Sequence, residues 1–192
     1  LGTGSNNLTN YNVRMGGGDD TFNLFDTLLN SFVSMDGEDL AEDGNDNFNG
    51  AGSLIVNSEV VGRGGNDVLN NLLLNGSIVN GNTGDDTINV NTASSASFVY
   101  GGQGTDTINV TANSTAVLVN GNKGSDIITV AAGVAFPNGS VYGGNGNDTI
   151  TMNSNTDGIL TSGDLGNDSI TAANGDDIIN GGNGDDTIIG AG

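Results

Sequence analysis

Aspartates recur at regular intervals along this chain, and each lies in a glycine-containing turn. Each of them stands two residues after a glycine and two residues before an apolar residue. They are Asp20, Asp46, Asp67, Asp86, Asp106, Asp126, Asp148, Asp168, Asp177 and Asp186. Glycine lets the backbone adopt positive φ and turn its carbonyls inward. Because calcium prefers six to eight oxygen ligands from carboxylates and carbonyls, the pattern predicts a row of calcium sites.

The residues that follow each aspartate predict a β-strand. Apolar residues alternate there with threonine and asparagine, as in Thr87–Val90 and Thr107–Val110. This period of two is typical of a strand with one buried and one solvated face. A second strand is expected before each turn, where Val60, Val79 and Val99 stand two residues ahead of the first glycine.

The spacing of the aspartates predicts stacked coils. It is 19 to 26 residues as far as Asp168 and nine residues after it. Each repeat therefore reads as strand, turn, strand, turn, and a chain that repeats in this way stacks coil on coil at about 4.8 Å per coil. We expect an all-β parallel solenoid of about 20-residue coils, forming a single domain over residues 1–192. Its repeats cover about residues 15–190, with irregular coils over residues 1–60 and an acidic insert at residues 36–46.

The composition excludes several classes of function. The net charge is −20, and the chain contains no histidine and no cysteine. The only cationic residues are Arg14, Arg63 and Lys123, too few for nucleic acid or an anionic membrane surface. No apolar run approaches the roughly 20 residues of a membrane span. Histidine-based triads and histidine-ligated zinc are impossible. A hydrolase that uses a carboxylate pair needs only Asp or Glu, but the regular aspartates are assigned to calcium and no isolated pair stands out, so no enzyme is expected.

Several turns resemble the nonapeptide of RTX proteins, the hemolysin-type calcium-binding repeats of secreted bacterial proteins. The stretches are "GGQGTDTIN", "GGNGNDTIT" and "GGNGDDTII". The resemblance implies a right-handed parallel β-roll with calcium between stacked loops. It also implies that the ten aspartates are ligands, together with backbone carbonyls near Gly101, Gly104, Gly143, Gly146, Gly181 and Gly184. Such repeats occur in S-layer proteins and large adhesins, which commonly leave the cell by type I secretion.

The sequence departs from a strict nonapeptide roll, which carries ions on both edges. Spacing of nine occurs only through Asp168, Asp177 and Asp186, so most of the rod is expected to carry calcium on one edge. Loops on that edge leave about eight gaps, and about eight Ca²⁺ would nearly balance the −20 charge. The loops at residues 121–126 and 163–168 lack the second glycine and predict weaker sites. The first two loops are the most irregular, because the first begins at Met15 and the second is interrupted by the acidic insert.

Simpler interpretations of these features remain open. The turns could be calcium-free, with their aspartates acting only as Asx caps. The acidic insert could be a second cation site or a solvated bulge. It does not fit the EF-hand spacing.

The function expected is a calcium-stabilised structural segment of a secreted, extracellular bacterial surface protein that self-associates or contacts neighbouring domains. The alternatives are an ice- or glycan-binding adhesin segment and an accessory RTX region of a toxin or enzyme. Outward loop residues such as Lys123 and Leu165 are a poor match for a flat ice lattice.

Overall fold

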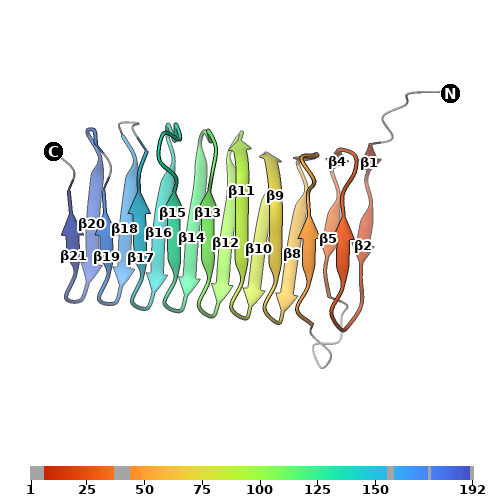
Figure 1. Cartoon of the computed structure of the whole chain (residues 1–192), viewed down its shortest axis with the longest axis horizontal. Helices are drawn as coiled ribbons and strands as arrows, with labels where there is room; N and C mark the ends of the chain where they lie inside the picture. The colour runs from red at the N-terminus through yellow and green to blue at the C-terminus, as the bar shows by residue number, and fades with distance from the viewer. Residues whose placement is uncertain (1–6, 37–43, 155–157, 173, 191–192) are drawn as a thin grey trace.

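The computed structural model describes residues 7–36, 44–154, 158–172 and 174–190. Over these residues the chain winds as a rod, with the two ends of the sequence at opposite ends of the rod (Figure 1). All regular elements are strands, and every strand pairing is parallel. The all-β parallel solenoid predicted from the repeats is confirmed. The described residues include no helix that could cross a membrane.

Two parallel sheets form the faces of the rod. The first contains β1 (Leu8–Thr9), β4 (Leu28–Leu29), β7 (Leu54–Val56), β9 (Val68–Asn75), β11 (Thr87–Ser94), β13 (Thr107–Val110), β15 (Ile127–Val130), β17 (Thr149–Met152), β19 (Ser169–Thr171) and β21 (Thr187–Ile189). It also contains β6 (Asn47–Asn49), which pairs with β9, and β3 (Thr21–Asn23), which pairs with β6. The second contains β2 (Asn12–Arg14), β5 (Phe32–Ser34), β8 (Glu59–Gly64), β10 (Ile78–Thr83), β12 (Ser97–Gln103), β14 (Val117–Lys123), β16 (Ser140–Asn145), β18 (Leu160–Leu165) and β20 (Ile178–Asn183). From β8 onward, successive strands alternate between the two sheets, so each coil contributes a strand to both.

The core lies between the sheets and is built from stacked columns of like residues. In the first sheet Ile88, Ile108 and Ile128 pair with one another in register, and all three are fully buried. In the second sheet Val79, Val99 and Val119 form the facing column. Because each coil covers its neighbour's apolar side chains, the core is continuous along the rod although a single coil encloses little.

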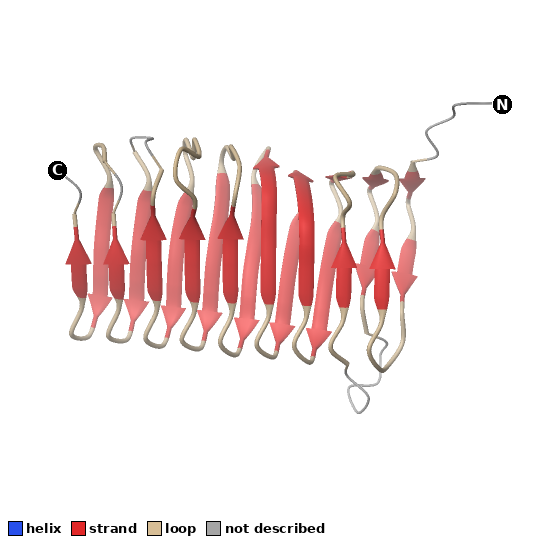
Figure 2. Ribbon diagram, viewed as in Figure 1, coloured by secondary structure: helices blue, strands red, loops and turns tan. Residues whose placement is uncertain are grey.

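The two edges of the rod differ in regularity. The glycine–aspartate turns form one edge of short, similar loops, whereas the loops of the opposite edge vary in length (Figure 2). The sequence predicted that extra residues lie at this opposite edge, and the connections at residues 111–116 and 131–139 confirm it. In the coils of β9 and β11 these residues instead extend the strands to eight residues each.

A ladder of buried serines holds the opposite edge together in the N-terminal half. Backbone N–H groups of Tyr11, Ser31, Ser58 and Ser77 donate to the Oγ atom of the serine in the next coil, at 2.9 to 3.3 Å. The accepting residues are Ser31, Ser58, Ser77 and Ser97. Each hydroxyl in turn donates to a backbone carbonyl, as Ser77 does to Ile55 at 2.8 Å. Since a hydroxyl both donates and accepts, this ladder satisfies itself without charge.

The residue before the serine column has a left-handed backbone in coil after coil. Its φ lies between 46° and 79° at Asn10, Asn30, Asn57, Gly76, Ala96, Ala116, Asn138 and Gly158. Asparagine and glycine tolerate this conformation, which explains their frequency at this edge. The repeated turn brings each coil back in register with the one before it.

Replacing Ser77 by alanine should lower the free energy of unfolding by about 1–3 kcal/mol, because the buried N–H of Ser58 loses its acceptor. Urea unfolding at saturating calcium measures this loss. Ser125→Ala is the matched control: Ser125 also accepts an N–H from the next coil, that of Asn147 at 3.2 Å, but it is exposed. Water can replace it, so its effect should stay within about 0.5 kcal/mol. Equal effects of the two variants would contradict the ladder's structural role.

Candidate metal sites along the aspartate edge

Each glycine–aspartate turn connects a strand of the second sheet to a strand of the first. Six residues of the turn occupy equivalent positions from coil to coil. The first position is Gly81 in one coil, Gly101 in the next and Gly121 in the third, each at the end of a strand of the second sheet. The sixth position is the aspartate that directly precedes the strand of the first sheet. Stacking the coils therefore stacks the aspartates in one column. We call this side of the rod the aspartate edge.

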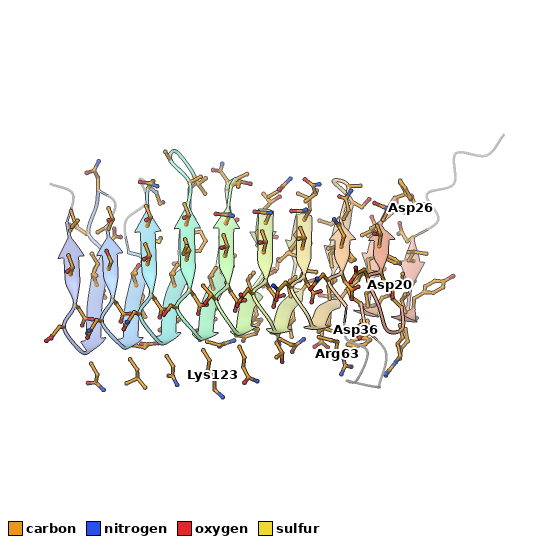
Figure 3. The ribbon with its side chains drawn as sticks, turned by 60° about the horizontal axis from the view of Figure 1, so that its bottom comes forward. Asp20, Asp26, Asp36, Arg63 and Lys123 are labelled. Atoms are coloured by element: carbon orange, nitrogen blue, oxygen red, sulfur yellow. The ribbon has the colours of Figure 1, made fainter. Side chains whose placement is uncertain are left out.

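A ladder of hydrogen bonds joins the aspartates of successive coils. The backbone N–H of each aspartate donates to Oδ1 of the aspartate one coil further on, at 2.6 to 2.9 Å. The column contains Asp20, Asp46, Asp67, Asp86, Asp106, Asp126, Asp148, Asp168 and Asp186. From Asp46 to Asp168 the side chains are buried. Asp20 lies toward the N-terminal end of this column (Figure 3).

In six members of the column the second carboxylate oxygen has no such partner among the described residues. Oδ2 of Asp67, Asp86, Asp106, Asp126, Asp148 and Asp168 is buried and accepts no hydrogen bond from the described residues. A buried, ionised oxygen without a partner is unfavourable by several kcal/mol. Either a proton or a cation must therefore accompany each of these carboxylates in the folded chain.

The first-position glycines make room for a second oxygen beside each Oδ2. A Cβ added at Gly101 would collide with Oδ2 of Asp106 and lie 2.7 Å from the carbonyl oxygen of Gly121 in the next coil. The same pair of oxygens, one carboxylate and one carbonyl, surrounds Gly81, Gly121 and Gly143. Glycine is required there because any side chain would displace these oxygens.

This donor set fits calcium. Calcium is a hard cation that binds carboxylate and carbonyl oxygens together. No three acidic, histidine or cysteine side chains converge within the described ranges. Backbone carbonyls would therefore have to supply the remaining ligands, as the stacked glycines allow.

Burial raises the pKa values of the carboxyl groups in the aspartate column, so it disfavours their ionised forms. Burial raises the pKa of Asp67 to about 8, of Asp86 and Asp148 to about 7, and of Asp106 and Asp126 to about 6. The N–H donated by the preceding coil opposes this rise. The neighbouring carboxylates of the column add to it, as Asp106 does for the pKa of Asp86.

Asp177 lies apart from the other nine predicted ligands. It occupies the serine column of the opposite edge, where its Oδ1 accepts the N–H of Ile159 at 3.1 Å. The spacing of nine between Asp168, Asp177 and Asp186 thus places carboxylates on both edges of the last coils, in agreement with the sequence analysis. Asp186 itself is half-exposed on the last coil.

The loops without a second glycine keep the same backbone shape. Asn122 and Asp164 have φ of 76° and 73°, in the left-handed region where Gly102 and Gly144 also lie. Asparagine and aspartate are the side chains that best tolerate this region. The weaker binding predicted for these two loops stays a prediction.

The two N-terminal loops do differ from the rest. Met15 and Met35 stand where later coils have the first glycine, and Met35 is fully buried. A methionine side chain at this position would fill the space that, beside Gly101, holds the carboxylate and carbonyl oxygens. Most of the acidic insert, residues 37–43, lies outside the described residues, so its interpretation remains a prediction. Asp36, at its start, is buried and accepts the N–H of Gly64 at 3.3 Å.

The serine column was not singled out from the sequence. Its signal was available: Ser31, Ser58, Ser77 and Ser97 each stand two residues before a core valine. A second ladder, formed by the residues that directly precede the aspartates of the column, was also missed. In it, Asp85 accepts the N–H of Thr105 at 2.7 Å.

The raised pKa values predict a change in the sign of the pH dependence on adding calcium. Without calcium, the folded chain binds more protons than the unfolded chain, whose aspartates titrate near 3.8. Its stability should be greatest below about pH 4 and fall as the pH rises through 6 to 8. With calcium, the ionised carboxylates are favoured, and stability should rise over the same range. Thermal unfolding followed by circular dichroism at pH 4.5 to 8, in EDTA and in calcium, tests this; parallel curves would contradict it.

Comparison with known families agrees with the geometry. The model of the RTX calcium-binding nonapeptide repeat matches residues 140–158 and 162–192. No curated protein and no solved structure matches the chain. The matched residues include the last loops of the aspartate edge, and the upstream loops stack on them through the same ladder. The C-terminal coils therefore match the RTX calcium-binding nonapeptide repeat, and the upstream coils continue the same parallel solenoid.

Proposed function

We propose that this chain is a structural rod of a secreted bacterial surface protein, and that calcium bound along its aspartate edge couples folding to arrival outside the cell. The observation that carries the proposal is the set of six buried carboxylates, from Asp67 to Asp168, whose Oδ2 atoms accept no hydrogen bond from the residues that the structure describes. The calcium sites would use the nine aspartates of this edge. Asp177 would serve a separate site at the opposite edge.

Metal-coupled folding suits the charge and the architecture. The chain carries a net charge of −20, and its folded form stacks carboxylates one coil apart, about 4.8 Å. Without cations this repulsion opposes folding, so the chain would stay extended where calcium is scarce. Extracellular calcium modules bind at about 10⁻⁴–10⁻³ M, which matches calcium outside the cell. Type I secretion of an unfolded chain would fit this order of events.

Self-association is supported by the C-terminal end of the rod. Ile178 and Ile189 are 66% and 56% exposed, and β20 and β21 each pair on one side only. Open strand edges beside exposed apolar side chains favour contact with further coils, from a second copy or a neighbouring domain. A lattice, a filament or an adhesin stalk could be built from such contacts.

Ice binding is less well supported than a structural role. The outer file of the first sheet contains Thr107 and Thr149, but Ile127 stands between them and is 46% exposed. On the loops, Leu165 interrupts the polar file in the same way. An ice-binding face needs a regular array, which these side chains break. The accessory-region alternative places any toxin or enzyme activity outside these residues.

Asp106→Asn tests the role of the column, because asparagine keeps the Oδ1 acceptor and removes the charge. At saturating calcium the variant should unfold with about 3 kcal/mol less free energy, since it loses one partner of a buried charge interaction. In EDTA at pH 5, below the pKa of about 6 of Asp106, the carboxyl is protonated, so the variant should be about as stable as the native chain. Urea unfolding under both conditions measures the two differences.

Asp85→Asn is the matched control. It removes the same charge from the neighbouring, exposed position, where other coils already have Asn66 and Asn147. It should change stability by less than about 0.5 kcal/mol in either condition. If Asp106→Asn destabilised the chain equally with and without calcium, the aspartates would be structural caps and the proposal would fail.

A further inference from the structure

A polar groove of about 520 Å³ lies on the outer face of the second sheet, next to the aspartate edge. Strands β10, β12, β14 and β16 form it. Six side-chain amides line it: Asn80, Asn82, Gln103, Asn120, Asn122 and Asn145. Its size is in the range of small-molecule binding sites. The calcium sites make no use of these side chains.

The register of three strands creates the groove. Asn82 and Asn122 lie one coil on either side of Gly102, which has no side chain. The two asparagines are therefore about 9.6 Å apart across an open floor. Asn80 and Asn120 flank Tyr100 in the same way, two residues earlier along the strands.

An aromatic surface continues the groove along β12. The rings of Phe98 and Tyr100 stack with centroids 6.3 Å apart and an interplanar angle of 9°. Both rings are half-buried on the outer face, so solvent reaches part of each. A ligand extending from the groove along the strand would meet these rings.

The amides of the groove have hydrogen-bonding capacity to spare. Oδ1 of Asn80 accepts the N–H of Asn82 at 3.1 Å, and Oδ1 of Asn120 accepts the N–H of Asn122 at 2.9 Å. These bonds orient the two amides and leave both Nδ2 groups as donors. Within the described ranges, no hydrogen bond engages the side chains of Asn82, Gln103, Asn122 or Asn145. Oriented donors and acceptors lower the cost of ordering on binding.

The charge of the groove selects its ligand. No carboxylate lines it, and Lys123 is its only charged residue, on a chain whose net charge is −20. Amides donate and accept, as sugar hydroxyls do, and an aromatic ring offers an apolar face against which a sugar ring can pack. We propose that this groove binds a neutral oligosaccharide, with its hydroxyls on the amides and one sugar ring packed beside Phe98 and Tyr100. The proposal requires the folded rod but not any particular number of calcium ions.

The test is calorimetric titration of the calcium-loaded chain with neutral hexasaccharides of different linkage, namely cellohexaose, laminarihexaose, maltohexaose and xylohexaose. The variant Asn82→Gly/Asn122→Gly removes two groove walls and should keep the fold, because Gly102, Gly144 and Gly182 hold the same left-handed position in other coils. We expect at least one hexasaccharide to bind the native chain and to bind the variant at least about tenfold more weakly.

The control variant is Asn89→Thr/Asn109→Thr on the first sheet, where later coils have Thr129 and Thr151 in the same column. It should bind like the native chain. Circular dichroism of all three proteins in calcium reports folding separately, so loss of the fold and loss of sugar binding are distinguishable. Failure of every neutral hexasaccharide to bind at about 10 mM, binding only to an acidic hexauronate, or equal binding by the groove variant would overturn the proposal.

Discussion

The structure depends on one constraint: carboxylates stacked coil upon coil at the buried edge of a parallel solenoid. Each aspartate uses one oxygen to receive the N–H of the preceding coil, and this bond sets the register of the loops. From Asp67 to Asp168 the other oxygen lies buried beside a glycine, where it accepts no hydrogen bond from the described part of the chain. Where the pH keeps these carboxylates ionised, the fold therefore needs a counterion for stability, and calcium is the cation whose chemistry fits the oxygens present.

At the opposite edge, uncharged side chains hold successive coils in register. There Ser58, Ser77 and Ser97 receive the N–H of the preceding coil, and their hydroxyls donate to nearby carbonyls. The serine ladder is complete as it stands, whereas the aspartate ladder is incomplete without a cation. The serine ladder ends at Ser97, because Val117 takes its position in the next coil, and near the C-terminal end Asp177 places a carboxylate there. A rod with one neutral and one charged edge can thus be held in register on one side and made to depend on calcium on the other.

Much of this architecture could be predicted from the sequence because the repeats are periodic. The Gly-x-Asp spacing located the coils, and the alternation after each aspartate located the strands and the core column through Ile88, Ile108 and Ile128. The serine ladder was harder to find, since single serines two residues before a valine are unremarkable until the coils are stacked. The extension of β9 and β11 into the opposite edge depends on packing between neighbouring coils rather than on local residue preference. The amide groove also required the structure, because its walls come from four coils and its floor from the absence of a side chain at Gly102.

The most direct test of the central claim is a calcium titration of the chelated chain at pH 8, followed by far-ultraviolet circular dichroism and sedimentation velocity. Calcium would be raised from about 1 μM to about 10 mM, which spans the affinities of calcium sensors and extracellular modules. The account predicts an extended chain at the start and a cooperative gain of β-structure, with a compact sedimenting species, as calcium approaches about 1 mM. A chain already folded in EDTA at this pH, with a spectrum that calcium leaves unchanged, would contradict it.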